Sequence, residues 1–384
     1  CPPRALALGL EHEDFLLAMA PHPVTILAKE RDFFDVRGSR EAFGRMKHVY
    51  NLLGHGDHVS LFIGPTDHGF SVENRTAMYQ AFSKAVGRKI PDDEPPLIVE
   101  EKETLQCTKS GQIAERDPKM IADFTKEKAI RLGQQRRRLA MPELAKVVVD
   151  VLKMPERIER PPGYRILRHI SRPNLPIKYA THYVVETEAP AAAICTMLYD
   201  ERHHARPVRV GNRALLYVSH RSSDSELQSL AWLRDDVVAA RDSGAMCFAC
   251  DVRGIGESQP NTCGIDTFDD VYGCDYFYAA NSMMLDRPYL GQKVWDVLRT
   301  IDWLVSFGYT EIDLVGNGWG ALISTFAALL DESVAKVKLV DRLESFESLA
   351  TDPDYQMPLA YMPLDVLKHF DLADCDRALV GKRR

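Results

Sequence analysis

Apolar and polar residues alternate along the first part of the chain in the manner of an α/β fold. Two short apolar runs, Pro23–Ala28 and Val59–Ile63, have the composition of buried parallel strands. An amphipathic helical pattern follows each run, over Ser39–Leu53 after the first and up to Val86 after the second. Residues 1–88 are therefore expected to fold as strand, helix, strand, helix.

The next segment, residues 89–160, has the composition of a linker followed by two helices. It begins with the charged, Pro-rich stretch Pro91–Pro96, and only Leu97–Val99 is apolar enough to add an edge strand. Two amphipathic connector helices are expected after it, one opened by Asp117-Pro118 and the other by Pro142.

From residue 161 to residue 384, the pattern changes first to closely spaced strands and then to strands that alternate with helices. Close spacing is typical of antiparallel hairpins, whereas helical crossovers imply a parallel sheet. We therefore predict an α/β fold with a mainly parallel sheet and helices on both faces. The expected strands are Tyr164–Ile170, Ala180–Glu188, Ala191–Tyr199, Ala214–Val218, Ala245–Cys250, Ile312–Val315 and Val337–Val340, and the expected helices are Ser225–Arg241, Gln292–Phe307 and a helix ending at Leu330.

Composition narrows the class of protein. A chain of 384 residues with 45% hydrophobic and 27% charged residues is typical of a soluble globular protein of two or three domains. The net charge of −7 argues against a nucleic-acid-binding surface, and the basic run Arg136–Arg138 is explained by a solvated helix end. No apolar stretch reaches the roughly 18 residues of a membrane span.

The eight cysteines predict neither a disulfide scaffold nor a metal site. Cys247 and Cys250 form a C-x-x-C pair, but they lie in a predicted strand, where residues three apart point to opposite faces. We therefore expect buried free thiols, and neither a metal nor a cofactor.

The two strands of the first segment each end beside a residue that is suited to acid–base chemistry. Asp32 follows the first strand and His68 follows the second. The carboxyl ends of parallel strands meet at one sheet edge, so a carboxylate could orient an imidazole that acts as a general base. The alternatives are that Asp32 caps the next helix, that His68 is an ordinary loop residue, and that Asp35 is the acid.

A glycine-rich turn follows the strand that ends at Val315. Gly316, Gly318 and Gly320 have the spacing of a G-x-S-x-G nucleophile elbow, with glycine at the nucleophile position. The turn thus keeps the architecture of an elbow without a nucleophile. The alternative is an ordinary glycine-rich strand-to-helix turn.

The order of motifs in the second half resembles that of α/β-hydrolases. Asp251–Ser258 follows a strand, the next helix carries Gly291, Gln292 and Asp296, and the elbow at Gly316 comes last. The chain is similar to acetylxylan-esterase-like and prolyl-oligopeptidase-like members of this superfamily. In the first segment, Glu30–Gly38 resembles the acid loop of these enzymes and Asp67–Phe70 the histidine loop.

The resemblance implies a serine carboxylic-ester hydrolase that deacetylates carbohydrate or small esters. In that reading Asp32 and His68 are the acid and base of a triad. His220 lies where such enzymes place their oxyanion loop, but Arg221 follows it in place of glycine. The nearby hydroxyls are expected to be loop residues and not nucleophiles: Ser219, Ser222, Ser223 and Ser225.

In this superfamily the nucleophile precedes the acid and the histidine, whereas here both precede the elbow. The simplest explanation is a tandem. Residues 1–88 would be the end of a first hydrolase domain, whose serine lies in an upstream half before Cys1. Residues 161–384 would be a second, degenerate and C-terminally incomplete copy. Lys368–Asp374 resembles Glu11–Leu17, which supports duplication.

Two further interpretations remain open. Residues 1–88 could dock beside residues 161–384 and complete their sheet in circularly permuted order. The second copy could also be a catalytically inactive pseudo-hydrolase that acts as a structural or interaction module. Peptidase or lipase-like activity and the compartment stay open, because the chain begins at Cys1 and any signal peptide would precede it.

Overall fold

The structure is a computed structural model that describes residues 2–89, 94, 96–172, 175–201, 206–259 and 275–383. Residues Ala5–Pro118 form one compact unit, and Lys119–Arg384, with Cys1–Arg4, form the other. Both helices predicted as connectors belong to the larger unit. The two units are described separately below.

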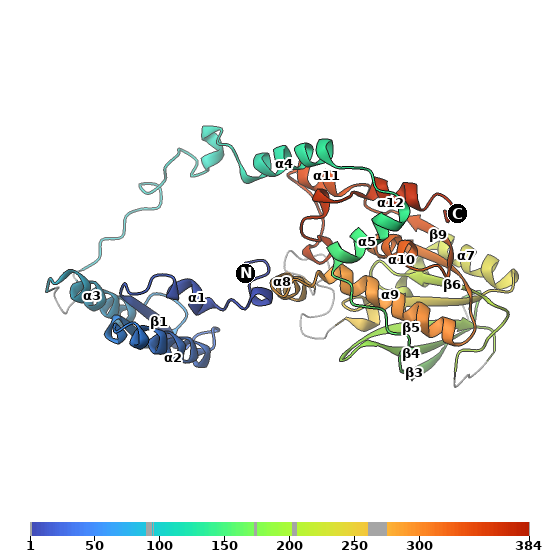
Figure 1. The fold of residues 1–384 in the computed structure, drawn as a ribbon, viewed down its shortest axis with the longest axis horizontal. Coiled ribbons are helices and arrows are strands. Elements are labelled where there is room, and N and C mark those ends of the chain that lie inside the picture. The colour runs from blue at the N-terminus through green and yellow to red at the C-terminus, as the bar shows by residue number, and fades with distance from the viewer. Residues whose placement is uncertain are drawn as a thin grey trace. The chain divides into compact units, whose positions relative to one another are not determined.

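The smaller unit has the predicted order of strand, helix, strand, helix, preceded by a short helix (Figure 1). Its two strands pair in parallel, with Val24 opposite Val59, as a two-stranded sheet. Both strands continue past their predicted ends. The elements are α1 (His12–Leu17), β1 (Val24–Arg31), α2 (Val36–Leu52), β2 (Val59–Asp67) and α3 (Val72–Val86).

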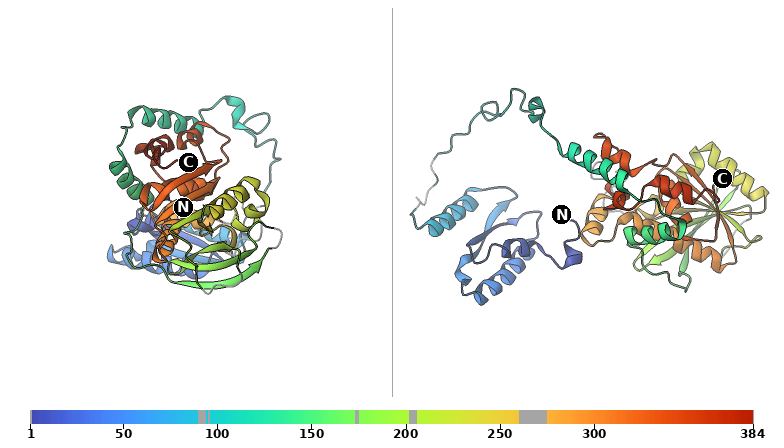
Figure 2. Two further views of the ribbon diagram at one scale, coloured as in Figure 1. Left: turned by 90° about the vertical axis from the view of Figure 1, so that its right-hand side faces the viewer. Right: turned by 45° about the horizontal axis from the view of Figure 1, so that its top comes forward.

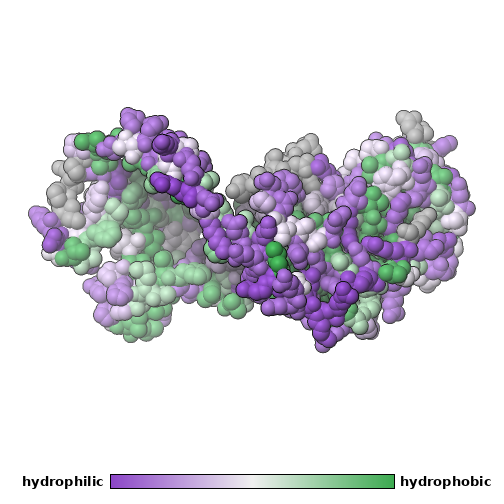
Figure 3. Space-filling model, turned by 90° about the horizontal axis from the view of Figure 1, so that it is seen from above, coloured by the Kyte–Doolittle hydropathy of each residue, from purple (hydrophilic) through white to green (hydrophobic). Residues whose placement is uncertain are grey.

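The core of the smaller unit is limited. Val24, Met46, Tyr50 and Val59 form one buried cluster, and the Tyr50 hydroxyl donates to the carbonyl of His22 at 2.9 Å. Apolar side chains remain exposed elsewhere in the unit, and green, apolar surface is visible on it at the left of Figure 3. Two parallel strands provide too little sheet to cover such side chains.

The stretch between α3 and the larger unit corrects two predictions. Leu97–Val99 forms no strand, since no strand of the described chain pairs with its backbone, and its side chains are exposed. Most of the Pro-rich stretch Pro91–Pro96, namely residues 91–93 and 95, lies outside the described residues. Asp117 does not cap a helix, because it adopts a φ of +47° at the end of the 3-10 turn Ile113–Arg116.

The larger unit begins with α4 (Ile121–Gln135) and α5 (Met141–Leu152). Helix α4 starts later than predicted, after Met120, whose N–H donates to the carboxylate of Asp123 at 2.7 Å. Helix α5 has Pro142 in its first turn, as predicted, and its apolar face is buried in the core.

A seven-stranded mixed sheet is the centre of the larger unit, in the order β3-β4-β5-β7-β6-β8-β9. The three closely spaced strands are antiparallel, as their spacing predicts, and β7, β6, β8 and β9 are parallel. The strands are β3 (Tyr164–Ser171), β4 (Tyr179–Glu188), β5 (Ala191–Tyr199), β6 (Arg213–Val218), β7 (Met246–Asp251), β8 (Glu311–Asn317) and β9 (Val334–Val340).

Helices lie on both faces of this sheet, which confirms the predicted α/β class (Figures 1 and 2). The single helix predicted over Ser225–Arg241 is two helices, because Leu230 between them has an extended backbone. The remaining helices are α6 (Ser223–Ser229), α7 (Ala231–Asp242), α8 (Tyr276–Met284), α9 (Tyr289–Ser306), α10 (Trp319–Leu330), α11 (Phe346–Thr351) and α12 (Leu372–Ala378).

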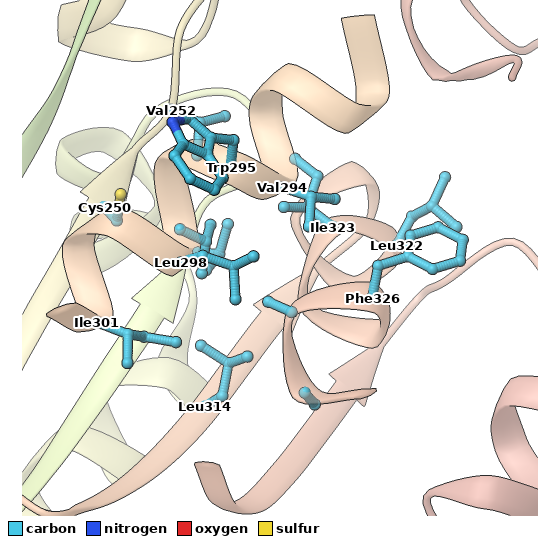
Figure 4. Packing of buried hydrophobic residues seen from close by; sticks show 14 of the residues in the cluster. Cys250, Val252, Val294, Trp295, Leu298, Ile301, Leu314, Leu322, Ile323 and Phe326 are labelled. Carbon is cyan, nitrogen blue, oxygen red and sulfur yellow. The ribbon is translucent and has the colours of Figure 1, made fainter. Parts of the chain in front are cut away.

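Alternate residues of the central strands point into two separate cores. Leu216 and Cys250 belong to the larger core, with α5, α9 and α10, whereas Leu215 and Cys247 belong to the smaller core, with α6 and α7. Cys247 and Cys250 are therefore on opposite faces, buried and free, as predicted. Figure 4 shows the contact of α9 with α10 over β8, with Val294, Leu298, Ile301, Leu314, Leu322, Ile323 and Phe326 labelled.

Helices α1 and α12 start with the same device, an aspartate in the first turn that accepts from the N-cap N–H. The pairs are Glu11 with Asp14 at 2.7 Å and Asp371 with Asp374 at 2.9 Å. If the starts of the two helices are equated, Glu11 corresponds to Asp371. The predicted alignment instead pairs Glu11 with Lys368, three residues earlier. The duplication itself stays a prediction, as does completion of the larger sheet by residues 1–88.

None of the helices in the described ranges combines the length and the apolarity that crossing a bilayer requires.

Candidate functional site

Asp32 and His68 are brought together by the parallel pairing of β1 and β2. Arg31 is opposite Asp67 in the register of the two strands, so the next residue of each strand leaves the sheet at the same edge. His68 Nδ1 lies 3.0 Å from both Asp32 Oδ1 and Oδ2. The predicted proximity of these two residues is therefore present in the structure.

The carboxylate is well covered, whereas the imidazole is open to solvent. The Asp32 side chain is 10% exposed and the His68 side chain 57%. Partial burial acts to raise the pKa of Asp32, but the N–H of Phe34, 3.2 Å from Oδ1, and the imidazole outweigh it, so this pKa is lowered. Asp32 therefore stays ionised, and Nδ1 is the nitrogen that faces it.

Asp35 does not compete for the imidazole. It is the N-cap of α2 and accepts from the N–H of Arg37 at 2.9 Å and from its Nε at 3.0 Å. The guanidinium of Arg37 lowers the pKa of Asp35. Capping of α2 thus belongs to Asp35, which removes the alternative role considered for Asp32.

Exposed aromatic side chains flank the imidazole. The ring centroid of Phe33 lies 4.5 Å from that of His68, and the ring centroid of Phe34 lies 6.0 Å away. Both side chains are mostly exposed, at 75% for Phe33 and 64% for Phe34. An apolar surface therefore surrounds the dyad on this side.

The elbow of the larger unit is a tight turn between β8 and α10. Gly318 adopts a φ of +52° and a ψ of −118°, a backbone conformation that side chains strongly disfavour. The two flanking glycines have no room for a side chain. A Cβ on Gly320 would lie 2.2 Å from the carbonyl oxygen of Val218, and a Cβ on Gly316 would lie 2.6 Å from Cα of Ala321. The turn thus has the sharp strand-to-helix form that a nucleophile elbow requires.

The imidazole of His220 occupies the space beside Gly318. A Cβ on Gly318 would lie 2.4 Å from His220 Nδ1 and 2.8 Å from its Cγ. That same Nδ1 accepts a hydrogen bond from the N–H of Trp319 at 3.2 Å. In an elbow of this kind, the N–H after the nucleophile is an oxyanion donor. His220 therefore lies beside this turn, where its imidazole occupies the space that a side chain at position 318 would enter and accepts from the N–H of the next residue.

The loop that carries His220 is held by a buried carboxylate that the sequence analysis missed. Glu226 is 7% exposed and accepts from the N–H groups of His220 at 3.1 Å, Arg221 at 2.6 Å and Ser222 at 3.0 Å. The hydroxyl of Tyr217 also donates to it. Its position four residues after the N-cap Ser222 was the available signal.

The serines near His220 have structural partners. Ser219 donates to Asp251 at 2.7 Å, and the N–H of Ser223 donates to the same carboxylate at 2.8 Å. Burial raises the pKa of Asp251, although these hydrogen bonds oppose it. Ser222 is the N-cap of α6. The expectation that these hydroxyls are loop residues holds for Ser219 and Ser222, whereas Ser223 and Ser225 lie in helix α6.

The residues after β7 form a buried ion pair with α9. Arg253 and Asp296 meet through two side-chain bonds of 2.9 Å and 2.7 Å, and the N–H of Arg253 also donates to Asp296 at 2.9 Å. Both residues are buried, so the pair fixes the loop that follows β7 to the helix. The motif residues of the second half thus have a structural role here.

Within the part of the chain that the structure describes, no group of three or more His, Cys, Asp or Glu side chains is arranged to hold a metal ion.

No protein-family model and no curated protein matches the chain. Solved structures of low identity are similar to it. A protein from Bacteroides fragilis NCTC 9343 that is proposed to be an acetyl xylan esterase has 15% identity, a TM-score of 0.48, and coverage of 63% of this chain and 65% of its own. The acetyl xylan esterase from Paenibacillus sp. R4 has 15% identity, a TM-score of 0.36, and coverage of 56% and 65%.

A glucuronoyl esterase from Solibacter usitatus has 10% identity, a TM-score of 0.40, and coverage of 63% of this chain and 71% of its own. The chain thus spans about 65% of the length of the two acetyl xylan esterase structures. The strand order and the helix layers of the larger unit define its α/β class.

Proposed function

We propose that this chain is part of a serine carboxylic-ester hydrolase in which Asp32 and His68 are the acid and the base. The observation that carries the proposal is the 3.0 Å approach of His68 Nδ1 to the carboxylate of Asp32 at the carboxyl ends of adjacent parallel strands. An ionised carboxylate at this position selects the tautomer that leaves Nε2 as the basic nitrogen.

In the proposed mechanism, Nε2 of His68 takes the proton of a serine hydroxyl as that oxygen attacks the ester carbonyl. Asp32 stabilises the imidazolium that forms, and backbone N–H groups bind the oxyanion. The imidazolium then returns the proton to the leaving alcohol. The serine would come from the upstream half of the first hydrolase domain, outside this chain, because Gly318 has no side chain that could attack.

The proposed substrate is an acylated carbohydrate or another small ester. This class follows from the sequence resemblance at Glu30–Gly38, Asp67–Phe70 and Asp251–Ser258. The exposed Phe33 and Phe34 beside the imidazole offer an apolar surface to the reacting group.

The test uses the longer protein that contains this chain and measures hydrolysis of 4-nitrophenyl acetate. His68→Ala should lower kcat by several orders of magnitude, and Asp32→Asn by about four, with unchanged circular dichroism. The exposed His48 of α2 provides the control, and His48→Gln should leave kcat unchanged. Near-normal turnover by His68→Ala would refute the assignment.

A second candidate function concerns the larger unit, which we propose is a non-catalytic structural or interaction module. The observation that favours it is the imidazole of His220 in the space beside Gly318, bonded to the N–H of Trp319. A serine-directed fluorophosphonate should leave residues 119–384 unlabelled, as read by mass spectrometry of tryptic peptides. Labelling of any serine there, together with phosphonate-sensitive turnover by this chain, would contradict the proposal.

A further inference from the structure

Lys29 is a buried lysine whose ammonium holds both ends of the loop that carries His68. It lies on β1, three residues before Asp32, and is 5% exposed. Its Nζ donates to Thr66 Oγ1 at 2.6 Å and to Ser71 Oγ at 2.7 Å. These two hydroxyls bracket His68 in the sequence, so one charged group ties the loop down on both sides.

The residues around Lys29 are arranged to let its side chain reach this position. Gly64 is opposite Lys29 on β2, and a Cβ there would lie 2.1 Å from Asn74 Oδ1 and 3.3 Å from Lys29 Cδ. The hydroxyl of Ser71 accepts from Lys29 and donates to Asn74 Oδ1 at 3.3 Å. Asn74 in turn donates to the carbonyl of Ala28 at 3.2 Å. The loop is thus connected back to β1 through a chain of hydrogen bonds.

A buried ammonium is costly, because water solvates it better than hydroxyls do. Within the described part of the chain, Lys29 forms no ion pair within 4.0 Å, and its Nζ is hydrogen-bonded to two neutral hydroxyls. A methionine of similar length could fill the same space without this cost. The ammonium therefore has a role other than filling space.

The imidazole depends on its loop for orientation, since its own packing is slight. His68 is 57% exposed and is in contact with exposed aromatic rings on one side. Displacement of a catalytic group by about 1 Å can cost two orders of magnitude in rate. Fixed loop ends are therefore needed to keep Nδ1 directed at Asp32.

We propose that Lys29 is a positioning residue for His68, which it keeps in the tautomer and orientation that face Asp32. The inference rests on the proposed function, because it assumes that His68 acts as the base. A merely structural lysine would affect the stability of the smaller unit and leave the tautomer of His68 unchanged.

The test measures the tautomer of His68 in the full 384-residue chain by long-range ¹H–¹⁵N correlation spectra. His68→Gln identifies its signals. In the wild-type chain we expect the Nδ1–H form to dominate. In Lys29→Met we expect at least a twofold shift of the tautomer ratio toward Nε2–H. Lys47 donates to the carbonyl of Gly56, away from the dyad, and Lys47→Met should leave the ratio unchanged.

An unchanged ratio in folded Lys29→Met overturns the role of Lys29 and leaves the proposed function standing. A wild-type chain without the Nδ1–H form instead refutes the dyad and hence the proposed function. If Lys29→Met does not give a dispersed amide spectrum, Thr66→Val and Ser71→Ala each remove one acceptor. Both should shift the ratio in the same direction, and no shift in either would equally overturn the proposal.

Discussion

Replacement of Gly318 by alanine tests whether the elbow is closed by His220. Alanine adds a single carbon at the position where a nucleophile side chain would begin. That carbon would lie 2.4 Å from His220 Nδ1, well inside van der Waals contact, on a backbone with a φ of +52°. The imidazole therefore has to move, and its bond from the N–H of Trp319 is lost.

The expected decrease in the unfolding free energy of Gly318→Ala has two parts. A non-glycine residue in such a backbone conformation costs about 1–3 kcal/mol. Loss of the hydrogen bond from Trp319 to His220 costs about 1 kcal/mol more. Gly318→Ala should therefore destabilise the larger unit by about 2–4 kcal/mol. In a His220→Ala background the second part is absent, so the two substitutions should be coupled by about 1 kcal/mol or more.

Gly244 provides a matched control for the backbone strain. It has a φ of +82°, and a Cβ there would meet nothing within 4 Å. Gly244→Ala should therefore cost only about 1–2 kcal/mol and show no coupling to His220→Ala. This control separates the strain of the backbone from the contact with the imidazole.

Urea unfolding followed by tryptophan fluorescence measures these free energies. All four tryptophans of the chain lie in the larger unit, so the signal reports on that unit: Trp232, Trp295, Trp303 and Trp319. If Gly318→Ala is as stable as the wild type, or lowers the unfolding free energy equally with and without His220, the imidazole does not fill the space beside Gly318.

Three other predictions follow from buried or ionised groups. Asp32→Asn should destabilise the smaller unit at neutral pH, as measured by urea unfolding followed by amide signals of β1. The difference in unfolding free energy from the wild type should begin to fall below the ordinary carboxyl pKa of 3.8 and vanish as the pH passes through the lowered pKa of folded Asp32. A constant difference down to pH 2 would contradict this. Asp296→Asn leaves the guanidinium of Arg253 buried without its main partner and should cost about 3–5 kcal/mol by tryptophan fluorescence, whereas a cost below 1 kcal/mol would be inconsistent with the pair. Iodoacetamide should label the exposed Cys107 in the folded chain. Burial raises the pKa of the other described thiols, which should react slowly: Cys195, Cys247, Cys250 and Cys375. Rapid modification of any of these four would disprove their burial.

The sequence pattern predicted the structure correctly where the spacing of apolar residues and the local chemistry agree. The apolar runs at Val24 and Val59 identified both strands of the smaller unit, and their order placed Asp32 and His68 at one edge. Helix α4 was placed too early, because Asp117-Pro118 has the composition of a helix start, yet Asp123 provides the cap that forms.

That pattern could not predict contacts between residues that are distant in the sequence. The placement of His220 against Gly318 joins positions 98 residues apart in the numbering and depends on the parallel pairing of β6 with β8. Lys29 directly follows the predicted strand Pro23–Ala28, and nothing in the local sequence connects it to Thr66 and Ser71. A lysine directly after an apolar run was the only available signal.

The two outer glycines of the turn have a consequence for how such a motif is interpreted. Gly320 is confined by the carbonyl of Val218, and Gly316 by the backbone of Ala321, and neither contact involves a reacting group. Any side chain at either position would separate the helix from the sheet, so both glycines are required by the backbone packing of the turn, whichever residue lies between them. A pair of glycines at this spacing therefore indicates a close strand-to-helix packing and is not by itself evidence of a nucleophile.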